Sequence, residues 1–582
     1  MHFLTVPTPF FFFTGKGGVG KTSVACATAV ELADRGRRVL LVSTDPASNV
    51  GQVFDTTIGN TITPIRSVPG LDALEIDPEE AAEAYRERIL APVANLLPAK
   101  DLQAITEQLS GSCTTEIASF NEFTELLSDT SMTEAYDHVI FDTAPTGHTI
   151  RLLQLPGEWT SFLDAGKGDA SCLGPMSGLD KQRSTYRAAL DALKDPRRTR
   201  LILVARAQES TLAELGRTQS ELADAGIVAT HLVLNGVLPD SEAGDLADAI
   251  HAREHAATDA MPEAIARLSR DVIGLKPMNM VGLPALRGLM SSAPTPAEVA
   301  APGDGAVDMP GLAAQIDRIE ADGRGLVMTM GKGGVGKTTV ASAIAVALAN
   351  RGHDVLLTTT DPAAHVSHAL ADGIPTLEVS SINPEAATRQ YREHVMATKG
   401  RDLDDAGREA LAEDLMSPCT EEIAVFQQFS DAVRQARRRF VIMDTAPTGH
   451  TLLLMDATGS YHRDIARHMD EGATFTTPLM RLQDPAYTKV IIVTLPETTP
   501  ILEAQDLQSD LERAGIHPWA WVVNNSLAAA QPTSALLSQR ATAELSQLAT
   551  VARTSDRVAV IATQIEEPAT RERLVSLTAS QE

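Results

Sequence analysis

The chain has 582 residues, of which 43% are hydrophobic and 21% charged, the balance of a globular protein long enough for several domains. Its formal net charge of −27 and aromatic content of 4% argue against nucleic acid as a partner, because such binding depends on clustered basic residues and stacking side chains. No apolar run is long enough to span a bilayer, so we expect a cytoplasmic protein without direct membrane insertion.

The chain begins with a strand, a glycine-rich loop and a helix. Residues 10–14, FFFFT, are expected to form a buried parallel strand, and residues 24–36, VACATAVELADRG, a helix that ends at Gly36. Between them lies GKGGVGKTS at 15–23. This pattern in this context predicts a phosphate-binding loop (P-loop), whose backbone N–H groups face the phosphates at the positive end of the helix dipole. A chance glycine turn is the alternative interpretation.

The residues of this loop have separate expected roles. Lys21 would neutralise the β- and γ-phosphate oxygens of ATP, and Thr22 would offer its hydroxyl to Mg²⁺. Lys16 is a second lysine that a P-loop does not need, and it requires its own explanation. The other nucleotide contacts expected in this loop are Gly15, Gly17, Gly18, Val19, Gly20 and Ser23.

Two acidic residues follow the next strands. Asp45 comes directly after the apolar strand at 37–44, where a carboxylate can orient the attacking water beside Mg²⁺. Asp142 ends the apolar strand at 138–142 and is expected to hold Mg²⁺. The alternatives are an Asp-Pro turn for Asp45 and a helix-capping acid for Asp142.

Possible ligands for a thiophilic ion lie between these strands and after the second of them. Cys113 begins an apolar helical pattern, and a thiol in the first turn of a helix is shifted toward thiolate. His148 follows the sequence DTAPTG, and Cys172 lies in a loop rich in Gly and Ser. Three thiols with imidazoles suit a soft ion, although free cysteines are more often small buried hydrophobes. Cys26, on the helix after the P-loop, is expected to pack in the core.

Most of these features return in the second half, in the same order. GKGGVGKTT at 331–339 follows the first loop by 316 residues, DTAPTGHT at 444–451 follows its copy by 302, and WVVNNSL at 521–527 follows LVLNGVL by 289. We therefore expect two homologous domains, 1–290 and 324–582, joined by a linker at 291–323. The alternation of strands and helices predicts an α/β fold, with a mostly parallel sheet flanked by helices in each P-loop domain.

The second copy repeats the candidate residues. Lys332 matches Lys16, and Cys419 matches Cys113 and follows Ser417-Pro418, a sequence typical of a helix N-terminus. The equivalents of the other phosphate, Mg²⁺ and histidine positions are Lys337, Thr338, Asp361, Asp444 and His450. The remaining nucleotide contacts expected here are Gly331, Gly333, Gly334, Val335, Gly336 and Thr339.

The extra lysine of each loop resembles the deviant Walker A, or signature-lysine, class of P-loop ATPases. In that class two domains face each other, and each signature lysine reaches the nucleotide bound opposite. The resemblance implies a monomeric chain that acts as an intramolecular pseudo-dimer, in which Lys16 serves the second site and Lys332 the first. Such a lysine supplies positive charge as an arginine finger does, only when the halves close.

Within this class the duplicated GKGGVGKT(S/T) and DTAPTGHT, together with three cysteines, are similar to the arsenite-translocating ATPase family over essentially the whole chain. The resemblance implies ATP hydrolysis stimulated by As(III) or Sb(III), and an adenine-contacting asparagine at Asn235 and at Asn524, with Asn525 as an alternative. It implies two partners, a membrane arsenite carrier that recruits the chain to the membrane surface and a small arsenic metallochaperone. The metalloid ligands implied are Cys113, Cys172, Cys419, His148, His450 and Ser417.

Other functions in the same ATPase class stay open. A related branch targets tail-anchored membrane proteins, but it is a homodimer that generally has a CxxC zinc pair, and this chain has no CxxC. A spatial-organising relative would carry a basic amphipathic membrane-binding tail, and an electron-transfer relative would need cluster cysteines in both halves. The sequence favours the metalloid-stimulated ATPase.

Overall fold

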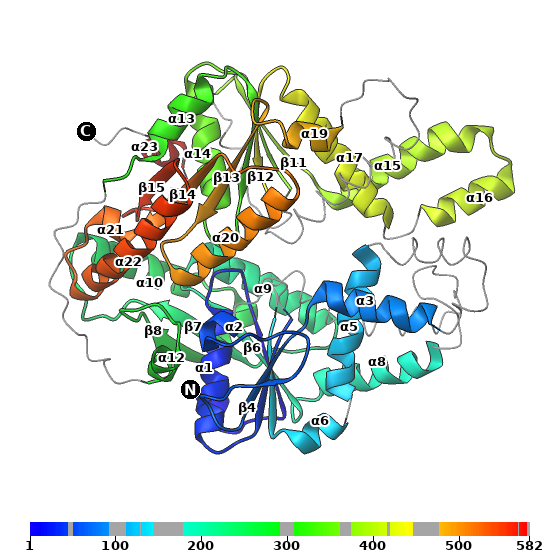
Figure 1. The fold of residues 1–582 in the computed structure, drawn as a ribbon, viewed down its shortest axis with the longest axis vertical. Helices are drawn as coiled ribbons and strands as arrows, with labels where there is room; N and C mark the ends of the chain where they lie inside the picture. The colour runs from blue at the N-terminus through cyan, green and yellow to red at the C-terminus, as the bar shows by residue number, and fades with distance from the viewer. Residues whose placement is uncertain are drawn as a thin grey trace. The chain divides into compact units, whose positions relative to one another are not determined.

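The computed structural model describes the backbone of residues 1–44, 50–91, 112–128, 130–143, 179–291, 308–360, 370, 374–415, 419–445, 477–568 and 570–578. The chain divides into two compact units, Met1–Val299 and Ala300–Glu582. Each unit is built around a sheet with helices on both faces (Figure 1). The expected α/β fold, present in two copies, is confirmed.

The first unit contains eight described strands and a set of covering helices. Its strands are β1 (Phe10–Thr14), β2 (Val39–Ser43), β3 (Thr63–Pro64), β4 (Leu71–Glu75), β5 (His138–Asp142), β6 (Thr199–Ala205), β7 (His231–Val237) and β8 (Ser269–Gly274). Its helices are η1 (His2–Leu4), α1 (Lys21–Asp34), α2 (Val50–Phe54), α3 (Pro78–Leu90), α5 (Ser112–Ser128), α6 (Thr130–Ala135), α8 (Leu179–Lys194), α9 (Glu209–Asp224), α10 (Asp245–Asp259), α11 (Glu263–Ala266) and α12 (Leu283–Leu289).

The second unit has seven described strands. They are β9 (Gly325–Met330), β10 (Val355–Thr359), β11 (Leu377–Ser381), β12 (Phe440–Asp444), β13 (Thr488–Thr494), β14 (Ala520–Ser526) and β15 (Val558–Ala562). Its helices are α13 (Leu312–Glu320), α14 (Lys337–Asn350), α15 (Pro384–Thr398), η5 (Lys399–Asp402), α16 (Asp405–Asp414), α17 (Cys419–Gln435), α19 (Pro478–Leu482), α20 (Thr498–Arg513), α21 (Leu527–Ala530), α22 (Ala535–Thr554) and α23 (Arg571–Ser576).

The two sheets have the same strand order apart from one edge strand. The first is β3-β4-β2-β5-β1-β6-β7-β8 and the second β11-β10-β12-β9-β13-β14-β15. Every described pairing is parallel except that of β3 with β4. In each sheet the strand that leads into the P-loop is an inner strand, with β5 and β6 beside β1, and β12 and β13 beside β9.

Both faces of each sheet are buried, which explains the continuous apolar strands. Alternate side chains of β1 enter opposite layers: Phe11 and Phe13 pack with α1, whereas Phe10 and Phe12 pack with α5, α8 and α9. The Phe12 ring stacks on that of Phe141 with 4.5 Å between centroids. In the second unit α13, α14 and α23 cover one face, and α17, α20 and α22 cover the other.

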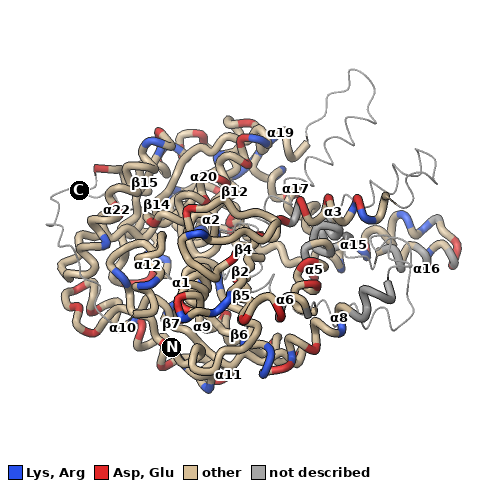
Figure 2. The backbone as a smooth tube through the Cα atoms, turned by 60° about the horizontal axis from the view of Figure 1, so that its bottom comes forward, with Lys and Arg blue, Asp and Glu red and all other residues tan. Residues whose placement is uncertain are grey.

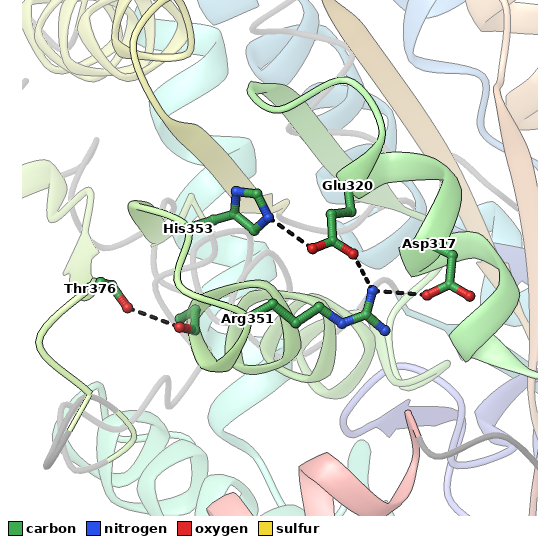
Figure 3. A network of polar contacts seen from close by, with 6 residues as sticks. Asp317, Glu320, Arg351, His353 and Thr376 are labelled. Atoms are coloured by element: carbon green, nitrogen blue, oxygen red, sulfur yellow. Dashed lines mark hydrogen bonds and ion pairs between the residues drawn. The ribbon is translucent and has the colours of Figure 1, made fainter.

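Part of the expected linker is a folded element. Helix α13 lies within the 291–323 range, and its Leu312, Ile316 and Ile319 are buried in the core of the second unit. Figure 3 shows the ion pairs between the C-terminal part of α13 and the residues that follow the P-loop helix α14. Arg351 pairs with Asp317 at 2.8 Å, and His353 pairs with Glu320 at 2.9 Å. The folded part of the second unit therefore begins before residue 324.

Acidic and basic residues are mixed along the described part of the chain. Acidic and basic positions are interspersed along the helices of both units (Figure 2). In the described part of the chain, no helix is both long enough and apolar enough to cross a membrane.

Candidate nucleotide-binding site

The two P-loops lie at the carboxyl ends of inner parallel strands. Residues 15–20 connect β1 to α1, and residues 331–336 connect β9 to α14. Lys21, Thr22 and Ser23 form the first turn of α1, and their equivalents Lys337, Thr338 and Thr339 form that of α14. Each loop therefore leads directly into a helix N-terminus, a position whose backbone N–H groups and dipole favour phosphate.

Two glycines in each loop are required by its shape. Gly20 and Gly336, which precede the helices, have φ angles of 88° and 92°, a left-handed conformation that disfavours other residues. A Cβ on either would also clash with the side-chain nitrogen of Asn235 or Asn524. At the start of each loop, a Cβ on Gly15 or Gly331 would clash with the carbonyl oxygen of the neighbouring strand, at Val204 or Val493.

The two lysines of each loop are linked through the backbone. The Lys21 ammonium donates to the carbonyl oxygen of Lys16 at 3.2 Å, and Lys337 donates to that of Lys332 at 3.0 Å. Both P-loop lysines are buried, with 6% of each residue exposed. This contact closes each loop on the ammonium group of its own P-loop lysine.

The expected Mg²⁺-binding acids lie beside the loops. Asp142 pairs in register with Phe13 of β1, and Asp444 pairs with Thr329 of β9; both aspartates are buried. Asp444 Oδ2 accepts hydrogen bonds from Thr338 Oγ1 at 2.7 Å and from Thr359 Oγ1 at 3.2 Å. The hydroxyl and the carboxylate predicted to share a metal ion are thus in direct contact in the second unit.

The predicted asparagines contact the P-loops. Asn235 Nδ2 donates to the Val19 carbonyl oxygen at 2.9 Å, and Asn524 Nδ2 donates to that of Val335 at 3.0 Å. The structure thus identifies Asn524, rather than the adjacent Asn525, as the geometric equivalent of Asn235. Each asparagine supports the loop just before its last glycine.

Two carboxylates that we had not predicted hold the extra lysines. Lys16 Nζ lies 3.2 Å from Glu214 Oε2 on α9, and Lys332 pairs with Glu503 on α20. The two glutamates are 289 residues apart, the same offset as that between the asparagines, so the repeat itself contained the signal. Sequence reasoning missed them because no motif surrounds them.

Several predicted residues lie outside the described part of the chain: Asp45, Asp361, His148, His450, Cys172 and Ser417. Cys113 is the second residue of α5 and Cys419 the first of α17, so both begin helices as expected, but their side chains are outside the described set. Among the residues that are described, no group of three or more His, Cys, Asp or Glu could hold a metal ion.

Cys26 is the core residue that the sequence predicted. Its side chain is fully buried, and burial raises the pKa of its thiol well above the usual value, with further contributions from the Asp142 and Glu75 carboxylates. A thiol held in the protonated form is a poor metal ligand.

A cavity of about 660 Å³ in the second unit lies away from this site. Its lining includes Arg318, Asp322, Lys489, Trp519 and Arg557, which precede or begin strands at the amino end of the sheet. The P-loops lie at the carboxyl end, so this cavity is not the nucleotide site.

Comparison with known proteins agrees with this geometry. A family model described as anion-transporting ATPase matches residues 8–292 and 325–481. The chain belongs to the anion-transporting ATPase family. The model matches two segments, one around each P-loop, as expected for a duplicated domain of this family. The predictions of an ATPase and of nucleotide binding are confirmed.

Members of this family resemble the chain over its full length. An arsenical pump-driving ATPase of Acidiphilium multivorum is 59% identical over 98% of both chains, and one of Escherichia coli is 58% identical over 99% of this chain and 100% of its own. A protein named ATPase GET3 from Meyerozyma guilliermondii is 36% identical but matches 29% of this chain. The resemblance to these arsenical pump-driving relatives thus extends over nearly the whole chain, whereas that to this GET3 protein is partial.

Proposed function

We propose that the chain is an As(III)- and Sb(III)-stimulated ATPase that drives extrusion of these ions through a membrane carrier. The observation that carries this proposal is the pair of P-loops, each closed on its own lysine, within a chain similar along its whole length to arsenical pump-driving ATPases. The GET3-like alternative has only partial matches and no CxxC pair in its favour.

The nucleotide chemistry follows from the loops. ATP phosphates would lie on the backbone N–H groups of residues 15–20 and 331–336, with Lys21 and Lys337 beside the β- and γ-phosphates. The Thr338–Asp444 contact offers hard oxygen atoms of the kind that Mg²⁺ prefers. Bound Mg²⁺ would neutralise phosphate charge, and the residues that would hold it or lie beside it are Thr22, Asp45, Asp142, Thr338, Asp361 and Asp444.

Hydrolysis then requires a positioned water and added positive charge. We assign the positioning of this water to Asp45 and Asp361. The threonine before each aspartate is hydrogen-bonded to the end of β5 or β12. Thr44 N–H donates to the Asp142 carbonyl oxygen, and Thr360 N–H donates to that of Asp444, both at 2.9 Å. We assign the added charge to Lys16 at the second site and Lys332 at the first, in a pseudo-dimer of the two units.

The metalloid would act on closure of the two units. In this proposal As(III) or Sb(III) is the transported ion, bound by thiolates from both halves, so that its binding favours the closed state and ATP in turn tightens metalloid binding. A membrane carrier would receive the ion and a small metallochaperone would deliver it. The proposed ligands are Cys113, Cys172, Cys419, His148, His450 and Ser417.

Steady-state ATP hydrolysis with and without arsenite or antimonite tests the proposal. We expect stimulation of the wild type and its loss in Cys113→Ala, Cys172→Ala and Cys419→Ala. Cys26→Ala is the matched control, because it also removes a thiol, but one buried in the core; it should retain stimulation. A folded wild type that neither metalloid stimulates would refute the proposal.

A further inference from the structure

The side chain of each signature lysine is held within its own unit. Lys16 pairs with Glu214 and Lys332 with Glu503, while the carbonyl oxygens of the same lysines accept hydrogen bonds from Lys21 and Lys337. Each signature lysine is therefore anchored at its backbone by the P-loop and at its ammonium group by a helix. The helices α9 and α20 follow the strands β6 and β13, the direct neighbours of β1 and β9.

Both carboxylates are poorly accessible to water. The Glu214 side chain is 13% exposed and that of Glu503 is 6% exposed, whereas the lysine partners are 32% and 17% exposed. Moving the lysine ammonium away from such a carboxylate takes its cation from a mostly desolvated negative charge, which is unfavourable. An ammonium group that leaves this pair must therefore gain an equivalent anionic partner, and a nucleotide phosphate is one.

The pair recurs at equivalent positions of two units that differ in sequence. The helices read LAELGRTQSEL in the first unit and ILEAQDLQSDL in the second, yet both place a glutamate against the extra lysine. The pair is thus present in both copies of the duplicated domain, although most of the residues around each glutamate differ.

We propose that Glu214 and Glu503 are positioning residues that restrain the signature lysines, an inference that rests on the proposed role of Lys16 and Lys332 in the opposite site. Each glutamate holds its lysine in the unit of origin, and the lysine transfers to a phosphate only when the units close around nucleotide. The restraint lowers hydrolysis in the absence of metalloid, and closure driven by As(III) or Sb(III) offsets it. Because Glu503 is the more buried, Lys332 is the more firmly held.

The test uses the full-length double variant Glu214→Gln/Glu503→Gln, which keeps the side-chain shape and removes the charge. We expect its hydrolysis without metalloid to rise about tenfold, which corresponds to about 1.4 kcal/mol of activation free energy. Stimulation by antimonite should fall by a similar factor, because the stimulated rate changes little. The matched control is Glu209→Gln/Glu512→Gln, which makes the same charge change at exposed positions of the same two helices and should behave as the wild type.

A second readout reports the lysines without catalysis. Acetylation by an N-hydroxysuccinimide ester, quantified by mass spectrometry in the absence of nucleotide, should increase several-fold at Lys16 and Lys332 in the double variant, relative to exposed Lys194. Unchanged acetylation, or lower hydrolysis without metalloid in a double variant that melts like the wild type, would overturn the inference.

The lysines themselves separate this inference from the proposed function. If Lys16→Ala and Lys332→Ala hydrolyse ATP at the wild-type rate, the proposed role of the lysines fails and the restraint fails with it. If they are inactive and only the glutamate variants depart from expectation, the restraint alone is refuted.

Discussion

At the scale of single residues, the asparagine behind each P-loop is a support for the loop as well as a candidate contact for the base. Its Nδ2 donates to the carbonyl oxygen of Val19 or Val335, and it occupies the space that a Cβ on Gly20 or Gly336 would need. The loop conformation and the asparagine thus depend on each other, since the close approach is possible only to a glycine.

Replacing the Asn235 amide with a carboxylate tests whether this hydrogen bond supports the P-loop. We expect Asn235→Asp to weaken ATP binding by about tenfold or more, because a carboxylate oxygen would face the Val19 carbonyl oxygen instead of a donor. Asn235→Ala removes the donor without adding repulsion and should bind ATP more tightly than the aspartate variant. Titration with a fluorescent ATP analogue measures both, and equal affinities for the two variants would contradict the supporting role.

Motifs place several of the predicted residues correctly in the fold. The loop residues, Asp142, Asp444 and both asparagines are found beside the P-loops, because strand order and local pattern place them there. Glu214 and Glu503 were not predictable in this way, since each lies one helix away from the lysine that it contacts, and only the tertiary structure brings them together.

At the scale of elements, a buried carboxylate holds the chain that follows β14, the strand that carries Asn524. Glu544 on α22 accepts hydrogen bonds from Ser526 Oγ and from the Ala528 N–H, both at 2.9 Å, and so fixes the start of α21. Glu254 on α10 similarly accepts a hydrogen bond from the Leu238 N–H at 3.1 Å. Burial raises the pKa of Glu544 to about 7, although these hydrogen bonds oppose the shift.

This pKa predicts a pH-dependent stability. Between the ordinary value of 4.5 and about 7, the folded chain binds the Glu544 proton more tightly than the unfolded chain does. This contribution to stability is therefore complete at low pH and is lost as pH rises to about 7. Glu544→Gln lacks the titration, so the unfolding free energy of the variant relative to the wild type should increase from about pH 5 to about pH 8, by up to about 3 kcal/mol.

Denaturant unfolding at both pH values measures the difference. Tryptophan fluorescence is a suitable signal, because Trp519 and Trp521 both belong to the second unit. Exposed Glu512→Gln serves as the control and should show no such trend. If the stability of Glu544→Gln relative to the wild type is the same at both pH values, the pKa of Glu544 is not raised in the folded protein.

Element prediction succeeded where burial is visible in the local pattern. The run FFFFT had to be buried on both sides, and β1 is, because each pair of alternate phenylalanines meets a different helical layer. The sequence predicts a linker where α13 lies, because the residues before it are rich in Pro, Ala and Gly. Its apolar positions pack on α14 and β15, elements that follow it in the chain, so the surface that stabilises it is not local.

At the scale of the whole molecule, the repeat is the strongest signal in the sequence. Motifs that return in one order predicted two domains of one fold, and the two sheets have matching strand orders around β1 and β9. Each unit also carries a P-loop in which the second lysine donates a hydrogen bond to the backbone of the first. A chain with two P-loops raises the question whether each one hydrolyses ATP alone, and the proposed exchange of signature lysines predicts that it does not.

Single P-loop variants of the full-length chain decide between coupled and independent sites. Independent sites would leave about half of the hydrolysis in Lys21→Ala or in Lys337→Ala, since each variant disables one of two turnovers. If closure requires nucleotide in both loops, each variant should instead lose about tenfold or more, because the remaining site never receives the lysine of the other unit. Steady-state rates of the two single variants, compared with Lys194→Ala as an exposed-lysine control, distinguish these outcomes. Residual rates of about half in both would mean that the units hydrolyse ATP separately, and the exchange of lysines would then have no place in the cycle.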